Sequence, residues 1–157
     1  MSTLPYTSVI YPESDGRPMG ETDLHRREMV RQIEILTRFY HGRQVYVSGD
    51  LLVFYEEGNP KKYIVPDVFV AKGVKPYDRR KYLIWAEGRA PTVVFEVTSR
   101  KTRKNDLELK PRLYRQIGVA EYFLFAPPQA YLSPPLQGYR MSGDVYESVP
   151  SPDSSSL

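Results

Sequence analysis

A single α/β domain of mixed α+β character is the fold class that the sequence predicts, and three patterns predict it. An apolar stripe at helical spacing before residue 42 gives way, from residue 45, to apolar runs with the two-residue period of strands. The first two runs, joined by a turn, predict an antiparallel hairpin, and a later strand-helix-strand order predicts a parallel pair. At 157 residues the chain is the size of one domain, which we expect at residues 22–149, between an extended arm at 1–21 and a disordered tail at 150–157.

The predicted N-terminal helix starts after Thr22, whose side chain is suited to cap it, and Gly42 is suited to end it. Its apolar stripe consists of residues three or four positions apart, namely Met29, Ile33, Leu36 and Tyr40. The charged residues fall mostly on other faces of the helix. We therefore expect this helix to pack one face against a core.

The predicted hairpin joins a strand at 45–55, bent at Gly49, to a strand at 63–71, because Glu-Gly-Asn-Pro at 57–60 is a strong turn signal. Pro66 has no amide hydrogen, so strand pairing is expected to be interrupted beside Asp67. The polar, turn-rich stretch that follows, residues 72–90, predicts a connection with one short element.

The second half of the chain predicts the parallel pair and a small hairpin. Its elements are a buried strand at 92–98, a basic turn at 99–105, a helix continuing to 117, a strand at 121–126 and a hairpin at 139–149. Pro111 removes a hydrogen bond inside a helix, so the regular helix either begins near Lys110 or is kinked.

Composition narrows the function classes. The 22 basic and 19 acidic residues give a net charge of +3, which is too even to argue for a nucleic-acid partner by itself. The absence of cysteine excludes a disulfide framework, and two histidines without a Gly-x-Ser-x-Gly motif argue against zinc and serine chemistry. No apolar run approaches the roughly 18 residues of a membrane span, and no leader is evident, so we expect a cytoplasmic protein without a membrane partner.

Two carboxylates stand alone in otherwise apolar strands, and they are the candidate site. Asp67 follows a proline and could instead cap a turn, while Glu96 could instead form a buried ion pair with an arginine. If the two strands are neighbours, both side chains can reach one cation, and the backbone carbonyl of Val97 adds a third oxygen of the kind that Mg²⁺ accepts.

Basic residues follow the second carboxylate. Lys110 is either part of this site or a surface lysine paired with Asp106 four residues earlier. The basic run is usually a solvated turn, but beside two carboxylates it would offset the repulsion of an approaching phosphodiester; it comprises Arg100, Lys101, Arg103 and Lys104. Weaker support extends such a surface to Lys61 and Lys62 and to Arg79, Arg80 and Lys81.

One ordered pattern covers roughly residues 25–149. It is carried by the segments Pro66-Asp67-Val-Phe-Val, Pro91-x-Val-Val-Phe-Glu96-Val-Thr-Ser99, the spaced residues Thr102, Asp106, Lys110 and Tyr114, Gly118-Val-x-Glu-Tyr122-Phe-Leu, and 134–140. In this pattern the chain resembles the Uma2 (DUF820) family of endonucleases, which belongs to the PD-(D/E)xK restriction-endonuclease-like superfamily. The resemblance implies a restriction-endonuclease-like core, in which a mixed β-sheet is flanked by helices.

The same resemblance implies a site and an activity. Asp67 and Glu96 would bind Mg²⁺, with Mn²⁺ as a substitute, for hydrolysis of DNA phosphodiesters. The superfamily lysine usually stands two residues after the second carboxylate, where this chain has Thr98; in Uma2 proteins the following helix is thought to supply it, and Lys110 is the matching position. Ala126 replaces an aspartate of many relatives, and the short C-terminal end leads us to expect an incomplete sheet edge or a homodimer.

Two other functions stay open. One is a nuclease-fold domain that binds nucleic acid or regulates without cutting, which Thr98 motivates. The other is a metal-independent hydrolase that acts on sugars through two carboxylates. Metal titration and sensitivity to EDTA would discriminate among the three.

Overall fold

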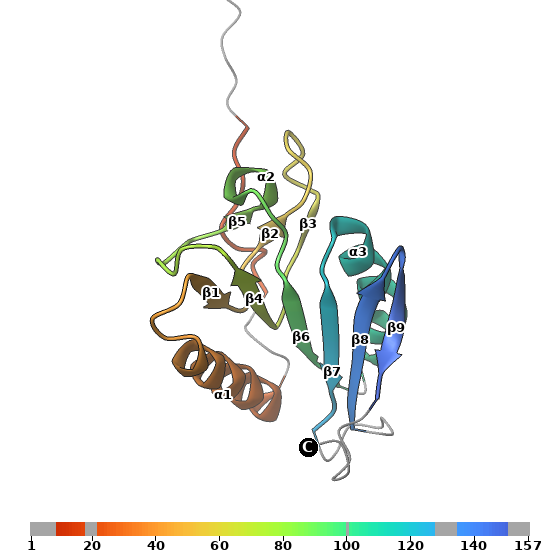
Figure 1. The fold of residues 1–157 in the computed structure, drawn as a ribbon. Helices are drawn as coiled ribbons and strands as arrows, with labels where there is room; N and C mark the ends of the chain where they lie inside the picture. Colours follow the sequence, from red (N-terminus) through yellow and green to blue (C-terminus); the bar gives the residue numbers. More distant parts are fainter. Residues whose placement is uncertain (1–8, 18–21, 100, 128–134, 151–157) are drawn as a thin grey trace, which may run out of the picture.

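The computed structural model describes residues 9–17, 22–99, 101–127 and 135–150, and within them a six-stranded mixed sheet forms the centre of the fold (Figure 1). In spatial order its strands are β1 (Val45–Ser48), β4 (Val68–Lys72), β6 (Val93–Val97), β7 (Glu121–Phe125), β8 (Leu136–Ser142) and β9 (Val145–Val149). The β6-β7 pair is parallel and the other neighbouring pairs are antiparallel. The predicted parallel pair and the predicted C-terminal hairpin are therefore confirmed.

Helices cover both faces of this sheet. On one face, α1 (Asp23–Phe39) packs Met29 against Val68 and Val97. On the other face, α3 (Lys110–Ile117) packs Tyr114 against side chains of β6 and β7, such as Val94. Within each strand these side chains alternate with the ones that face α1. The predicted helix cap is confirmed, since the amide of His25 donates to Oγ1 of Thr22 at 3.1 Å.

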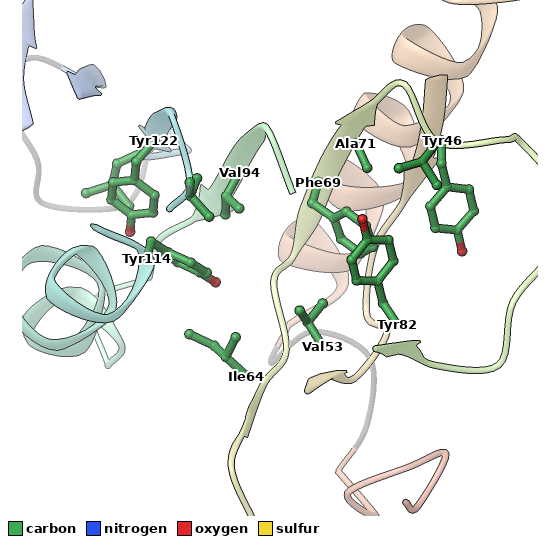
Figure 2. Close-up of a cluster of buried hydrophobic side chains, with 12 residues drawn as sticks. Tyr46, Val53, Ile64, Phe69, Ala71, Tyr82, Val94, Tyr114 and Tyr122 are labelled. Carbon is green, nitrogen blue, oxygen red and sulfur yellow. The ribbon is translucent and has the colours of Figure 1, made fainter. Parts of the chain in front are cut away.

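A smaller sheet lies beside the first one, and a shared core joins the two. The smaller sheet contains β3 (Tyr63–Ile64), β2 (Val53–Phe54) and β5 (Tyr82–Leu83), in that order, and the short helix α2 (Ile84–Glu87) follows β5. Figure 2 shows Tyr114 and Tyr122 at one end of the buried cluster and Tyr46 and Tyr82 at the other. Because this cluster spans both sheets, β6 and α3 have a fixed position relative to the β2-β3 hairpin.

The strand predicted at 45–55 is wrong as a single element. The chain forms β1 and β2, which belong to different sheets, and it turns at Asp50, where φ is 49°. Gly49 is needed at this turn because a Cβ there would overlap the backbone carbonyl oxygen of Asp67 and lie 2.8 Å from Ile33 Cδ1. The antiparallel pairing itself is confirmed, with β1 on β4 and β2 on β3.

The awkward Pro111 has a specific solution in the structure. A π-helical turn, Asn105–Leu109, precedes α3, and the amide of Lys110 donates to the carbonyl of Asn105 five residues earlier. Pro111 consequently lies in the first turn of α3, where its missing amide hydrogen costs little.

Parts of the predicted arm, connection and tail lie within the described residues. Residues 9–17 of the expected arm contain no helix or strand, and the rest of the arm up to residue 21, like 151–157 of the expected tail, lies outside the described residues. The short element expected within 72–90 corresponds to β5 and α2. Within the described ranges, no helix is both long enough and apolar enough to cross a membrane.

Candidate active site

A cleft of about 810 Å³ opens where β4 and β6 separate, next to the start of α1 and the π-helical turn. Residues that line it include His25, Asp67, Val97, Lys101, Asp106 and Lys110, whereas Glu96 is fully buried beside this lining and bonds to Lys110. These residues come from four parts of the chain that the sheet and the two helices bring together. The cleft is therefore a product of the tertiary fold rather than of a single loop.

Asp67 lies where strand pairing stops. Pro66 leaves a gap between β3 and β4, and its carbonyl accepts the amide of Asp50 at 3.0 Å. Oδ2 of Asp67 accepts two hydrogen bonds, from the amide of Val97 at 2.8 Å and from Nε2 of His25 at 3.0 Å. Burial acts to raise the pKa of Asp67, but the hydrogen bond from His25 and the charge of Lys110 outweigh it and hold that pKa below its usual value.

Glu96 has no solvent exposure, and its partners are not the arginine that was considered as an alternative. Nζ of Lys110 donates to Oε2 at 3.0 Å, and the hydroxyl of Tyr114 donates to Oε1 at 2.6 Å. Both donors project from α3 toward β6, four residues apart on one face of the helix. Each carboxylate oxygen has two lone pairs, so each can still accept a second ligand.

Lys110 contacts a second carboxylate as well, because Nζ lies 3.4 Å from Oδ1 of Asp106. The pair with Asp106 proposed as the surface alternative thus exists, but the lysine is not on the surface: its side chain is 19% exposed, and that of Asp106 is 2% exposed. Burial alone would lower the pKa of Lys110, whereas the charges of Glu96, Asp106 and Asp67 raise it above its usual value. The ammonium is therefore charged at neutral pH.

The site carries more negative than positive charge. Lys110 contacts Glu96 and Asp106, and the charge of Asp67 also acts on its ammonium. Burial, together with the charges of Asp67 and Asp106, raises the pKa of Glu96 well above its usual value despite Lys110. A divalent cation would relieve the same excess of negative charge.

The donor set fits a hard cation such as Mg²⁺. The amide of Thr98 donates to Phe125 in β7, and successive residues of a strand direct their backbone groups to opposite sides, so the carbonyl of Val97 faces the Asp67 side. Two carboxylates and this carbonyl offer oxygen ligands only, and water commonly fills the remaining positions of Mg²⁺. No group of three His, Cys, Asp or Glu side chains with metal-binding geometry occurs in the part of the chain that the structure describes.

The basic residues expected near the site separate into different environments. Lys101 and Lys61 line the cleft, while Arg103 and Lys104 are exposed at the start of the helix. Arg100 lies outside the described residues. Arg79 does not extend this surface, because it is buried in an ion pair with Glu87, with Nε 2.7 Å from Oε1.

Sequence reasoning missed the part played by His25 and left the roles of Asp106 and Tyr114 unassigned. A histidine in the first turn of an amphipathic helix carries little signal alone, because only the fold brings it to Asp67. Asp106, Lys110 and Tyr114 did give a signal, since their spacing of four residues predicts one polar stripe. The spacing did not reveal that this stripe faces a buried carboxylate.

The fold is similar to that of a solved structure described as "a putative nuclease belonging to DUF820 from Anabaena variabilis ATCC 29413". The TM-score is 0.60 at 14% sequence identity, and the match covers 85% of this chain and 71% of that chain. The domain therefore has a nuclease fold, in which a mixed sheet is flanked by helices.

The family assignment comes from the sequence and agrees with that fold. The chain belongs to the Uma2 family, whose model, described as "Putative restriction endonuclease", matches residues 12–156. A comparison with curated proteins found no match.

Proposed function

We propose that this protein is a metal-dependent endonuclease that hydrolyses phosphodiester bonds of DNA, with Mg²⁺ as its cofactor and Mn²⁺ as a substitute. The observation that carries the proposal is that Asp67 and Lys110 line one cleft, while the ammonium of Lys110 lies 3.0 Å from Glu96, a carboxylate that is fully buried beside the cleft. An ion pair between Lys110 and Glu96 that served only the fold would not need a second carboxylate, that of Asp67, at the start of the neighbouring strand and in the same cleft. The family to which the chain belongs supports the same activity.

Three oxygen donors would hold the cation: the carboxylates of Asp67 and Glu96 and the backbone carbonyl of Val97. When bound there, Mg²⁺ would polarise a phosphate and lower the pKa of a coordinated water. The chain itself fixes these donors before substrate arrives. Asp67 is held by the Val97 amide, and Glu96 is held by Tyr114.

Lys110 would act on the phosphate. An ammonium has three hydrogen-bond donors, and the described contacts direct two of them at Glu96 and Asp106. The remaining donor is available to a water or to a phosphate oxygen in the cleft. A preorganised positive charge at that point would stabilise the negative charge that gathers on the phosphate oxygens during hydrolysis.

The cleft also offers positive charge away from the carboxylates. Lys61 comes from the connection between β2 and β3, and Lys101 comes from the turn before the π-helical segment, so the two approach the cleft from different elements. Contacts with phosphates on either side of the scissile bond would offset the repulsion from the acidic site. The basic run Arg100, Lys101, Arg103 and Lys104 is thus proposed as the nucleic-acid contact.

The test is cleavage of supercoiled and linear duplex DNA in Mg²⁺ and in EDTA, by the wild type and by Asp67→Asn and Glu96→Gln. We expect cutting by the wild type in Mg²⁺ alone and none by either variant, with circular dichroism showing both variants folded. Full cleavage by a variant would reject the site. Metal binding without cutting would favour the regulatory nucleic-acid-binding domain, and hydrolysis of a sugar substrate in EDTA would favour the two-carboxylate hydrolase.

The assembly and the location of the protein stay predictions. Sedimentation at several protein concentrations would test the expected homodimer, and fractionation of cells would test the expected cytoplasmic location.

A further inference from the structure

His25 reaches the candidate active site from a helix that supplies no carboxylate or lysine to it. It lies in the first turn of α1, it is 7% exposed, and its Nε2 is 3.0 Å from Oδ2 of Asp67. The imidazole also lines the cleft. A histidine so placed either joins the helix to the sheet or acts on the carboxylate that it contacts.

The position of His25 is fixed from two directions. Its own amide donates to Oγ1 of Thr22, and the amide of Arg26 donates to the carbonyl of Thr22 at 3.0 Å, so the helix start is well defined. One turn further along, Met29 packs against Val68 and Val97, which flank Asp67 and Glu96 in the sequence. The imidazole therefore meets Asp67 at a geometry that the helix, and not the side chain alone, determines.

The two donors to Asp67 converge on the same oxygen. His25 and the amide of Val97 both bond to Oδ2, and a carboxylate oxygen has two lone pairs. Oδ2 is consequently saturated, so Oδ1 is the oxygen that remains for another ligand. The amide that bonds to Asp67 belongs to Val97, the residue directly after Glu96 in β6, so the two carboxylates come from neighbouring parts of the sheet.

We propose that His25 is the positioning residue of Asp67, because its hydrogen bond to Oδ2 fixes the carboxylate so that Oδ1 faces the cation. This inference rests on the proposed metal-dependent function. Carboxylates that bind metals are commonly oriented by hydrogen bonds from a second layer of residues, and loss of such a partner typically costs 10- to 100-fold in metal affinity.

A link that serves only the stability of the fold would behave differently from a positioning residue. If His25 only joins α1 to the sheet, the loss of metal affinity in each variant should parallel its loss of stability. If it positions Asp67, metal affinity follows the presence of a donor that reaches Oδ2. The two roles are separated by His25→Gln, which keeps a terminal N–H group near the place of Nε2, and His25→Leu, which keeps the volume without a donor.

The experiment measures Mn²⁺ affinity of the full chain from the electron paramagnetic resonance signal of free Mn²⁺. We expect His25→Leu to weaken binding about 10- to 100-fold, and His25→Gln to restore most of it. The matched controls are His41→Leu and His41→Gln, which change an exposed histidine outside the cleft and should bind Mn²⁺ as the wild type does. Unchanged affinity in His25→Leu overturns the inference.

Two further outcomes keep the test decisive. If His25→Leu does not fold, His25→Asn replaces it, because the shorter amide does not span the distance to Oδ2; weak Mn²⁺ binding supports the inference and wild-type binding overturns it. A wild-type protein that binds no Mn²⁺ overturns the proposed function and this inference with it. Wild-type binding that is lost in Glu96→Gln but unchanged in His25→Leu overturns only this inference.

Discussion

Lys110 and Glu96 form an ion pair across the interface of α3 and β6, with Nζ 3.0 Å from Oε2 of a carboxylate that has no solvent exposure. An ionised carboxylate in this position is costly unless it is compensated, and Lys110 and Tyr114 provide part of that compensation. The same pair also places an ammonium at the edge of the cleft, so one contact serves both the stability of the fold and the chemistry proposed for it.

Replacing Lys110 by Met should lower stability as well as abolish cleavage. The change leaves Glu96 buried without its ammonium, and breaking one side of a buried pair typically costs about 3–5 kcal/mol in the free energy of unfolding. Urea denaturation of the metal-free protein measures this cost. Lys62→Met, which removes an exposed lysine, is the control and should leave stability nearly unchanged.

A double-mutant cycle isolates the pair itself. Glu96→Gln combined with Lys110→Met removes both charges, so we expect the double variant to be more stable than the sum of the two single changes predicts. Additive losses would mean that Lys110 and Glu96 contribute to stability independently and that the contact has no energetic role.

Gly49→Ala tests the close contact that supports Asp67. The added Cβ would overlap the carbonyl oxygen of Asp67 and press on Ile33, so the backbone beside Asp67 must move. We expect a loss of about 1–3 kcal/mol in the free energy of unfolding, together with weaker Mn²⁺ binding. At Gly58 (φ 88°) the same substitution meets open space, so Gly58→Ala should cost stability through its backbone conformation but leave Mn²⁺ binding intact.

Lys61 and Lys101 should contribute to DNA affinity through phosphate contacts. We expect Lys61→Ala and Lys101→Ala each to weaken binding and to reduce the slope of log affinity against log salt by about 0.9. Fluorescence anisotropy with duplex DNA in EDTA measures binding without cutting. Lys72→Ala serves as the matched control, because Lys72 is exposed at the opposite end of β4 from Asp67. An unchanged slope for both cleft variants would remove them from the DNA contact.

Stability should fall at alkaline pH because a buried and a half-buried tyrosine keep their protons in the folded state. Burial raises the pKa of Tyr82 and Tyr146, whose hydroxyls donate to the carbonyls of Arg89 and Val119. Above the usual tyrosine pKa of about 10 the unfolded chain releases these protons while the folded chain keeps them, so the free energy of unfolding decreases as pH rises. Below that pH the two states bind equal numbers of these protons and no loss occurs.

Tyr146→Phe checks the alkaline effect one residue at a time. The variant should lose about 1 kcal/mol at neutral pH with the hydrogen bond, yet show a shallower decline above the usual tyrosine pKa. Urea unfolding across that pH range gives both quantities, with Tyr77→Phe at an exposed position as the control. An identical alkaline slope in Tyr146→Phe and the wild type would contradict the assignment.

The sequence predicts most elements of the fold because their periodicity is strong. The prediction fails where the extent of a strand depends on the strand with which it pairs. The two-residue period from Val45 to Tyr55 is broken only at Gly49, so a single bent strand is the natural prediction. The structure instead divides this run at Asp50, because Gly49 passes against Asp67 and the two halves pair with different strands. Local pattern identifies an element but does not identify the strand that it pairs with.

The candidate site shows the same limit. A lone carboxylate in an apolar strand is visible in the sequence, and so is the spacing of Asp106, Lys110 and Tyr114 along one helical face. That Lys110 and Tyr114 both bond to Glu96 depends on how α3 crosses β6, and that His25 bonds to Asp67 depends on where α1 begins. Contacts between distant segments follow from tertiary packing, which no single-sequence pattern encodes.

The most direct test of the central claim is a crystal structure of the protein soaked in Mn²⁺, with anomalous difference density recorded near the manganese edge. We predict a peak bound by the carboxylates of Asp67 and Glu96 and by the backbone carbonyl of Val97. A well-ordered site without such a peak, in which Lys110 still pairs with Glu96 and His25 with Asp67, would contradict the account.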